Sequence, residues 1–188
     1  GYSVAANEVT FATGAKFSLY TFFMAVVNPG DEVIIPTPYW VSYGDQVKMA
    51  EGVPVFVQAK EDNHFKVTVE QLEAARTDKT KVLVLNSPSN PTGMIYSREE
   101  LLAIGNWAVA HDVLILADDI YGRLVYNGNE FVPISSLSEA IRKQTIVING
   151  VSKAYAMTGW RVGYAVGNPE IIAAMSKLTG QTTSNLTA

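Results

Sequence analysis

Val113-Leu-Ile-Leu-Ala-Asp-Asp-Ile-Tyr121 is the most informative segment for predicting the fold. Its first five residues are apolar, which is typical of a strand that is buried on both faces of a parallel sheet. Two carboxylates, Asp118 and Asp119, follow directly. A buried carboxylate destabilises a fold by several kcal/mol unless it has a partner. The segment therefore predicts a strand that ends at a polar site.

Similar apolar runs occur on both sides of this segment. We predict strands at Val9–Thr13, Glu32–Ile35, Val53–Val57, Lys81–Leu85, Val113–Ala117, Thr145–Asn149 and Val162–Val166. Between them, helical patterns cover Ala15–Val27, Val69–Arg76, Arg98–Ala110 and Glu170–Leu178. Capping signals precede three of these helices, namely Thr68-Val-Glu-Gln71, Ser97-Arg-Glu-Glu100 and Asn168-Pro169. Strands and helices alternate, so we expect one three-layer α/β/α domain with a mostly parallel sheet of about seven strands.

The composition narrows the classes of function. The chain has 188 residues, of which 48% are hydrophobic, enough for one sizeable core. A formal net charge of −4 argues against nucleic-acid binding, which needs clustered basic residues. The absence of cysteine excludes disulfides and favours the reducing cytoplasm. The longest apolar stretch, residues 19–27, is far shorter than the ~20 residues of a membrane-spanning helix.

Lys153 lies in the segment Asn149-Gly-Val-Ser-Lys-Ala-Tyr-Ala-Met-Thr-Gly-Trp-Arg161, directly after a predicted strand. Asn86-Ser-Pro-Ser-Asn-Pro-Thr-Gly93 follows another strand, as does Ala117-Asp-Asp-Ile-Tyr121. Ligands of such sheets bind at the carboxyl ends of the strands. In this order and spacing, the three segments resemble the fold type I enzymes that use pyridoxal 5'-phosphate (PLP). The resemblance is to the class I/II aminotransferases, follows the aspartate aminotransferase branch closely and covers nearly the whole chain.

The resemblance implies a catalytic role for Lys153, Asp118 and Tyr121, and a cofactor-binding role for Asn90. Lys153 is matched to the lysine that forms a Schiff base with PLP and moves a proton as general acid and base. Asp118 is matched to the carboxylate that pairs with the protonated pyridine nitrogen. Tyr121 and Asn90 are matched to donors to the phenolic oxygen of the cofactor, and Asn90 also to the residue that orients the substrate carboxylate.

The remaining cofactor contacts concern the phosphate group and the ring face. Gly14-Ala15-Lys16 lies where a strand turns into a helix, and helix N-termini bind anions. Arg161 is the expected charged ligand of the phosphate, with Ser152 as a further hydroxyl. Trp40 is matched to the aromatic residue that stacks on the ring. The chain departs from the family at Gly150, where many relatives carry serine, and at Asp119, where they usually carry glutamate.

Several of these residues also have a purely structural interpretation. Lys153 is then a solvated loop lysine, Asp118 or Asp119 a helix N-cap, Gly14–Lys16 an ordinary turn and Trp40 a core tryptophan. We expect Asn86 to organise its loop. We expect Trp107 and Trp160 to be core or packing residues. We expect His64 and His111 to be structural or solvated, because two isolated histidines have no metal-ligand spacing.

By resemblance, the activity is transfer of an amino group from aspartate to a 2-oxo acid such as 2-oxoglutarate, by a homodimer. We expect residues 1–188 to be the PLP-binding large domain, truncated at both ends and inactive alone. Alternatives on the same fold are an aromatic or alanine aminotransferase, a β-lyase, and a non-catalytic domain that holds PLP. A nucleotide-binding doubly wound domain is disfavoured, because the chain has neither G-x-G-x-x-G nor a Walker-type loop.

Overall fold

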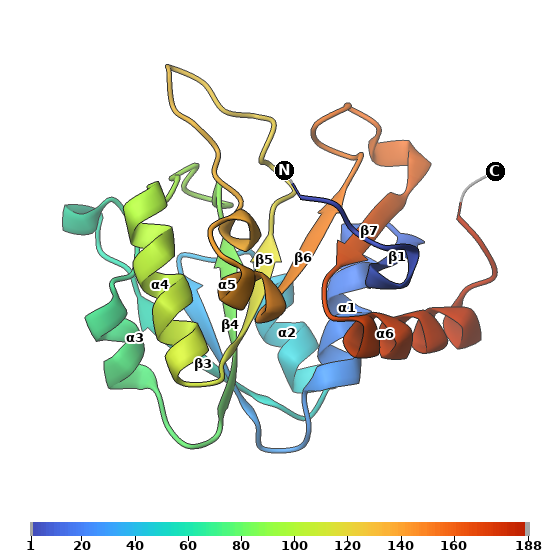
Figure 1. Ribbon diagram of the computed structural model, residues 1–188, viewed down its shortest axis with the longest axis horizontal. Helices are drawn as coiled ribbons and strands as arrows, with labels where there is room; N and C mark the ends of the chain where they lie inside the picture. Colours follow the sequence, from blue (N-terminus) through green and yellow to red (C-terminus); the bar gives the residue numbers. More distant parts are fainter. Residues whose placement is uncertain (1, 187–188) are drawn as a thin grey trace.

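The computed structural model describes residues 2–186 and contains one seven-stranded sheet, in the order β1-β7-β6-β5-β4-β2-β3 (Figure 1). Strand β7 is antiparallel to both of its neighbours, and the other pairs are parallel. The strands are β1 (Val9–Thr13), β2 (Glu32–Thr37), β3 (Val53–Gln58), β4 (Thr80–Asn86), β5 (Leu114–Asp118), β6 (Thr145–Gly150) and β7 (Val162–Val166). All of the predicted strands are confirmed, with ends within two residues.

Four of the six α-helices were predicted, and two were not. The predicted ones are α1 (Ala15–Val26), α3 (Val69–Ala75), α4 (Arg98–Ala110) and α6 (Pro169–Thr182). Helix α6 continues for four residues past Leu178, where its apolar pattern stops. The pattern therefore predicted the end of this helix too early. Helices α2 (Ser42–Met49) and α5 (Glu139–Lys143) were missed. Helix α2 has no side-chain cap, and α5 is a short helix of five residues, so neither gives a strong signal.

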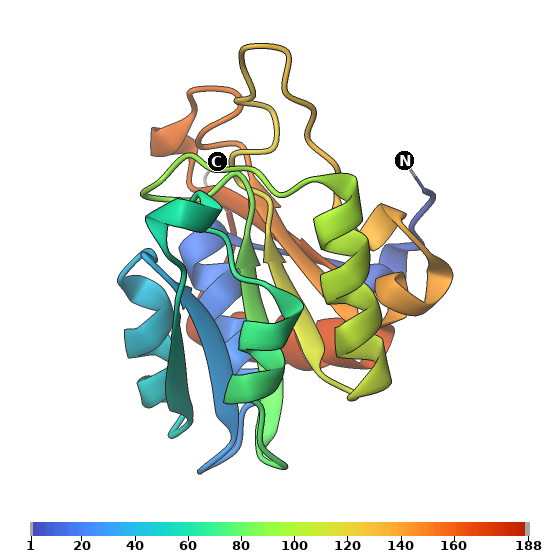
Figure 2. The same cartoon turned by 90° about the vertical axis from the view of Figure 1, so that its left-hand side faces the viewer.

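The helices cover both faces of the sheet (Figure 2). Helices α1, α2 and α6 pack on one face, and α3, α4 and α5 pack on the other. Each face of the sheet therefore has its own hydrophobic core. In strand β4, Val82 and Val84 pack against the side of α1, α2 and α6, whereas Leu83 and Leu85 pack against the side of α3, α4 and α5. Alternate residues of a strand point to opposite faces. A strand covered on both faces is therefore apolar at consecutive positions, as the sequence indicated.

The strand order brings the carboxyl ends of β4, β5 and β6 side by side. Asn86, the last residue of β4, is in register with Asp118 at the end of β5, and Asp118 is in register with Ile148 of β6. Beside them, α1 begins against β7, where a Cβ on Gly163 would lie 2.3 Å from the backbone nitrogen of Ala15. No helix among residues 2–186 is both long and apolar enough to cross a bilayer.

Candidate functional site

A cavity of about 230 Å³ lies at this carboxyl edge of the sheet. It brings together every predicted site residue except Gly14, from segments that are far apart in the sequence. Its lining consists of Ala15, Lys16, Leu19, Trp40, Tyr43, Asn86, Asn90, Asp118, Ile120, Tyr121, Ser152, Lys153, Thr158 and Arg161. The first α1 residues, the end of β5 and the turn after β6 thus contribute to one site.

Asp118 ends strand β5 and is only 3% exposed. Its Oδ2 accepts a hydrogen bond from the Tyr43 hydroxyl at 2.7 Å, and its Oδ1 accepts one from the Ile120 backbone N–H at 3.3 Å. Burial raises the pKa of Asp118 to about 6, and the two hydrogen bonds act in the opposite direction. No helix follows β5 directly, so the N-cap interpretation of this carboxylate is wrong.

Asp119 is also buried but lies on the other side of the strand. It lines a separate cavity together with Arg123, Tyr155 and Tyr164. Burial raises the pKa of Asp119 well above its usual value, and the neighbouring Asp118 charge adds to the effect. Since consecutive strand residues face opposite ways, only the first of the two aspartates reaches the cavity lined by Lys153.

Asn86 joins two parts of the site. Its Nδ2 donates to the backbone carbonyl of Asp118 at 2.8 Å, and its Oδ1 accepts from the backbone N–H of Asn90 at 2.7 Å. The side chain therefore fixes the end of β5 and the start of the Asn90 turn relative to each other. The prediction that Asn86 organises its loop is confirmed.

One end of the cavity is suited to an anion. Gly14 is the residue before α1, with a φ of 91°, and the first N–H groups of a helix have no partner within it. The Arg161 guanidinium lies against this glycine, so that a Cβ on Gly14 would be 2.2 Å from Nη2. Arg161 Nη1 donates to the carbonyl of Thr158 at 3.0 Å. A helix N-terminus and an arginine thus share one small region, and only glycine permits their close approach.

Lys153, Tyr121 and Trp40 line the other parts of the cavity. Lys153 is exposed in the turn after β6, and its Nζ lies 5.9 Å from the centroid of the Tyr121 ring. Among residues 2–186, Lys153 takes part in no ion pair. The half-buried Trp40 packs edge-to-face on Tyr43, and the Nζ of Lys16 lies 4.9 Å from its ring centroid. Trp40 is thus both cavity wall and edge of the core.

These features fit PLP, the cofactor expected from the sequence. The start of α1, with the Arg161 guanidinium packed against Gly14, suits a phosphate. Asp118 supplies a buried carboxylate for a protonated ring nitrogen, and Lys153 supplies a primary amine for an aldehyde. Arg161 for the phosphate, Asp118 for the ring nitrogen and Lys153 for the aldehyde carbon thus all line one cavity.

Several features of the site were not predicted. Leu19, Tyr43, Ile120 and Thr158 line the cavity without having been expected there. Tyr43 follows Trp40 by three residues, and recognition of helix α2 would have placed it near the site. Among the tryptophans, Trp107 is buried as predicted, but the prediction of a packed Trp160 is wrong, because it is 53% exposed. His111 has a structural contact with Glu73, as expected.

Comparison with known proteins gives a consistent result. Residues 2–188 match the family of class I and II aminotransferases. The chain is 73% identical to an asparagine–oxo-acid transaminase of Streptococcus mutans, over all of this chain and 48% of that protein. It is 53% identical to an aspartate aminotransferase of Bacillus subtilis, over 97% of this chain and 46% of the relative.

Solved structures agree with the sequence relatives. The crystal structure of an aspartate aminotransferase from Rhizobium meliloti matches with a TM-score of 0.95 and 47% identity, over 98% of this chain and 46% of that one. A Thermus thermophilus aspartate aminotransferase with maleate matches with a TM-score of 0.94 and 42% identity, over 100% and 48% of the two chains. The chain thus spans about half the length of the relatives that it matches.

Proposed function

Since the chain belongs to the class I and II aminotransferases, we propose that it forms the PLP-binding part of an enzyme that transfers the amino group of aspartate to a 2-oxo acid such as 2-oxoglutarate. One observation carries this proposal. Lys153 and Asp118 line the same cavity, beside the anion-binding end formed by Arg161 and the start of α1. An amine, a buried carboxylate and a phosphate cradle are together what PLP needs from a protein.

Each residue has a defined task in this proposal. Lys153 would hold the aldehyde end of the cofactor with its amine and would move a proton to and from the α-carbon of the substrate. Asp118 holds the proton on the ring nitrogen, and bound PLP then supplies an electron sink for the negative charge that develops on the α-carbon. The chain provides these two groups from the ends of neighbouring strands.

The remaining residues bind and orient the cofactor. Tyr121 and Asn90 donate hydrogen bonds to its phenolic oxygen. Arg161, Ser152 and the N–H groups of Ala15 and Lys16 bind the phosphate. Trp40 covers one face of the ring. All of these side chains or backbone groups lie on the cavity wall.

Asparagine is a second candidate for the amino donor. The 73% identical relative from Streptococcus mutans is named an asparagine–oxo-acid transaminase, whereas the relatives named aspartate aminotransferase and 53 to 56% identical to this chain are less similar. The two donors differ only in a carboxylate or an amide at the far end of the side chain. Initial rates of the full-length enzyme with aspartate and asparagine, each with 2-oxoglutarate, distinguish them.

The proposal extends to the organisation of the enzyme. Residues 1–188 form the large domain, and the active enzyme is a cytoplasmic homodimer that contains further segments. The chain covers 46 to 48% of its curated relatives, and this share supports the proposal of further segments. We therefore expect the 188-residue chain to bind PLP but to show little or no transaminase activity.

Visible absorbance on addition of PLP tests the cofactor assignment. Lys153 is expected to form a covalent carbon–nitrogen bond with the aldehyde, which gives a yellow band. Borohydride reduction followed by peptide mass spectrometry should then find the pyridoxyl group on Lys153. The matched control is Lys177→Ala, since Lys177 lies on α6 and not on the cavity wall.

Lys153→Ala should abolish both the band and the labelled peptide, whereas Lys177→Ala should retain both. A folded wild-type chain that gives no band, or that is labelled at another lysine, would contradict the proposed function.

A further inference from the structure

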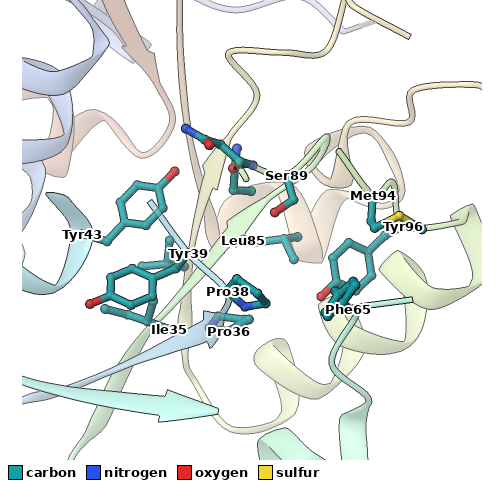
Figure 3. A pocket seen from close by; sticks show the side chains of 13 residues that line it. Ile35, Pro36, Pro38, Tyr39, Tyr43, Phe65, Leu85, Ser89, Met94 and Tyr96 are labelled. Atoms are coloured by element: carbon teal, nitrogen blue, oxygen red, sulfur yellow. Dashed lines mark hydrogen bonds between the residues drawn. The ribbon is translucent and has the colours of Figure 1, made fainter. Parts of the chain in front are cut away.

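Tyr43 lies between two cavities. One is the candidate site, and the other is a smaller pocket of about 30 Å³ behind it. Figure 3 shows this smaller pocket, with Tyr39 and Tyr43 on one side and Phe65 and Tyr96 on the other. Tyr43 is 2% exposed, so its hydroxyl needs a hydrogen-bond partner within the protein.

Asp118 is that partner. The distance from the Tyr43 hydroxyl to Oδ2 is 2.7 Å, whereas the Ile120 N–H approaches Oδ1 only to 3.3 Å. Short O–H···O⁻ contacts are characteristic of strong, charge-assisted hydrogen bonds. The hydroxyl is therefore the stronger of the two donors that hold this carboxylate.

The Tyr43 ring and backbone have separate contacts. The ring packs edge-to-face on Trp40 with centroids 5.5 Å apart, and the Tyr43 backbone N–H donates to the Trp40 carbonyl at 3.1 Å. Neither contact involves the hydroxyl. Replacement of Tyr43 by phenylalanine therefore removes the bond to Asp118 and preserves the packing of the cavity wall.

The electrostatic surroundings of Asp118 make this bond important. The cavity is also lined by Lys16 from α1, Tyr121 after β5, Lys153 after β6 and Arg161 before β7, and Asp119 is the next residue along the chain. Within residues 2–186, no cation forms an ion pair with Asp118. Burial favours the neutral carboxyl, and the Tyr43 hydroxyl is the main donor that favours the carboxylate.

We propose that Tyr43 is a positioning residue, whose hydroxyl keeps Asp118 ionised and fixes one carboxylate oxygen so that the group can pair with a protonated ring nitrogen in the cavity. The identity of the ring rests on the proposed function. The effect of Tyr43 on Asp118 belongs to the chain itself and can be measured without any cofactor.

The first experiment is a ¹³C NMR titration of the aspartate carboxyl groups in the cofactor-free chain. The Asp118 signal is assigned by its absence in Asp118→Asn. In Tyr43→Phe, the titration midpoint of Asp118 should rise by about one to two pH units, which corresponds to loss of a hydrogen bond to a charged group.

Tyr96→Phe is the matched control. Tyr96 is also buried, and its hydroxyl accepts from the Val67 N–H at 3.0 Å and does not contact Asp118. The Asp118 midpoint should be unchanged in this variant. An unchanged midpoint in Tyr43→Phe as well would overturn the proposal. If Tyr43→Phe does not fold, the wild-type Tyr43 hydroxyl proton is followed instead, and its chemical shift must change at the Asp118 midpoint.

The second experiment measures dissociation constants for PLP and for 1-deaza-PLP, in which carbon replaces the ring nitrogen. Tyr43→Phe should weaken PLP binding about tenfold and leave the affinity for the deaza analogue unchanged, because only the nitrogen interacts with Asp118. Equal weakening for both ligands would indicate a merely structural role. If wild-type chain binds neither ligand, the proposed function fails, and the titration still decides the role of Tyr43.

Discussion

Two carboxylates in this molecule have opposite relations to their surroundings. Asp118 is buried at the end of β5 and accepts two hydrogen bonds, and burial raises its pKa to about 6. Glu73 lies on α3 with 45% of its side chain exposed, and hydrogen bonds from Arg76 and Trp107 lower its pKa to about 2. Both groups accept hydrogen bonds that suit a negative charge, but Asp118 is only 3% exposed, so burial outweighs those bonds.

The difference separates Asp118, which we propose to serve binding, from Glu73, which serves stability. Glu73 accepts from Nε and Nη2 of Arg76 at 3.0 and 2.9 Å, accepts from Trp107 Nε1 at 2.8 Å and lies 3.3 Å from His111 Nε2. These contacts tie α3 to α4. Among residues 2–186, Asp118 forms no ion pair, and it lines an open cavity. A buried charge without a counterion destabilises the fold by itself and is ready for a cationic ligand.

The largest expected effect concerns cofactor binding. Asp118→Asn should weaken PLP binding about hundredfold or more, because removal of one partner of a buried charge pair costs about 3–5 kcal/mol. Glu73→Gln should leave this affinity unchanged. Titrations followed by visible absorbance compare the two variants. Similar losses in both would show that the contrast between the two carboxylates is wrong.

The second effect concerns the stability of the cofactor-free chain. The pKa of Asp118 rises from 3.8 to about 6 on folding, so folding favours the protonated form. Stability from this group is complete below about pH 4 and is lost as the pH rises through about 6, a loss of about 3 kcal/mol.

Asp118→Asn should therefore be more stable than wild type at pH 8 and similar to it at pH 4. Urea unfolding at both pH values measures this difference. A variant that is less stable than wild type at pH 8 would show that the buried carboxylate is already fully compensated by its hydrogen bonds.

The third effect concerns Glu73, whose contribution to stability depends on pH in the opposite direction to that of Asp118. Its pKa is lowered on folding, so its contribution is present above about pH 4.5 and is lost as the pH falls towards 2. Glu73→Gln should lower the melting temperature at pH 7 by roughly 2–4 °C. The loss relative to wild type should shrink in acid. Differential scanning calorimetry at pH 7 and pH 3 checks both statements. The control is Glu130→Gln, at an exposed loop carboxylate that forms no ion pair within residues 2–186.

The smallest effect concerns a neutral polar group near the site. Among the described residues, the Ser18 hydroxyl in α1 is buried and has no hydrogen-bond partner. Ser18→Ala should be neutral or stabilise the chain by up to about 1 kcal/mol, since alanine favours helix and leaves no hydroxyl unsatisfied. Chemical denaturation measures the change. Marked destabilisation would reveal a partner for the hydroxyl, such as a bound water.

The sheet was predictable because its strands are covered on both faces. Such strands are apolar at consecutive positions, as in Val82–Leu85, and this pattern indicates a buried strand. The capping boxes likewise indicated where α3 and α4 begin. Helix α2 was missed because its sequence, Ser42–Met49, contains a glycine and lacks a side-chain cap. Its amphipathic pattern is too short to stand out from a loop.

The site was predictable as far as its residues belong to family motifs. The hydrogen bond between Tyr43 and Asp118 joins residues 75 positions apart, and nothing in either local sequence indicates it. Similarly, Asp118 and Asp119 look alike in the sequence, and only the direction of β5 decides which one faces the cavity. The exposure of Trp160 was not predictable from its hydrophobicity either, because it depends on the turn that precedes Arg161.

The place of β7 in the sheet has a consequence for the synthesis of the chain. Gly14 follows β1 and Arg161 precedes β7, and these two strands are neighbours in the sheet although they lie far apart in the sequence. On a ribosome, Gly14 and Arg161, the residues that we propose to hold the phosphate, therefore cannot meet until β7 has emerged. The proposed phosphate site is therefore completed only after the other six strands of the sheet have been synthesised.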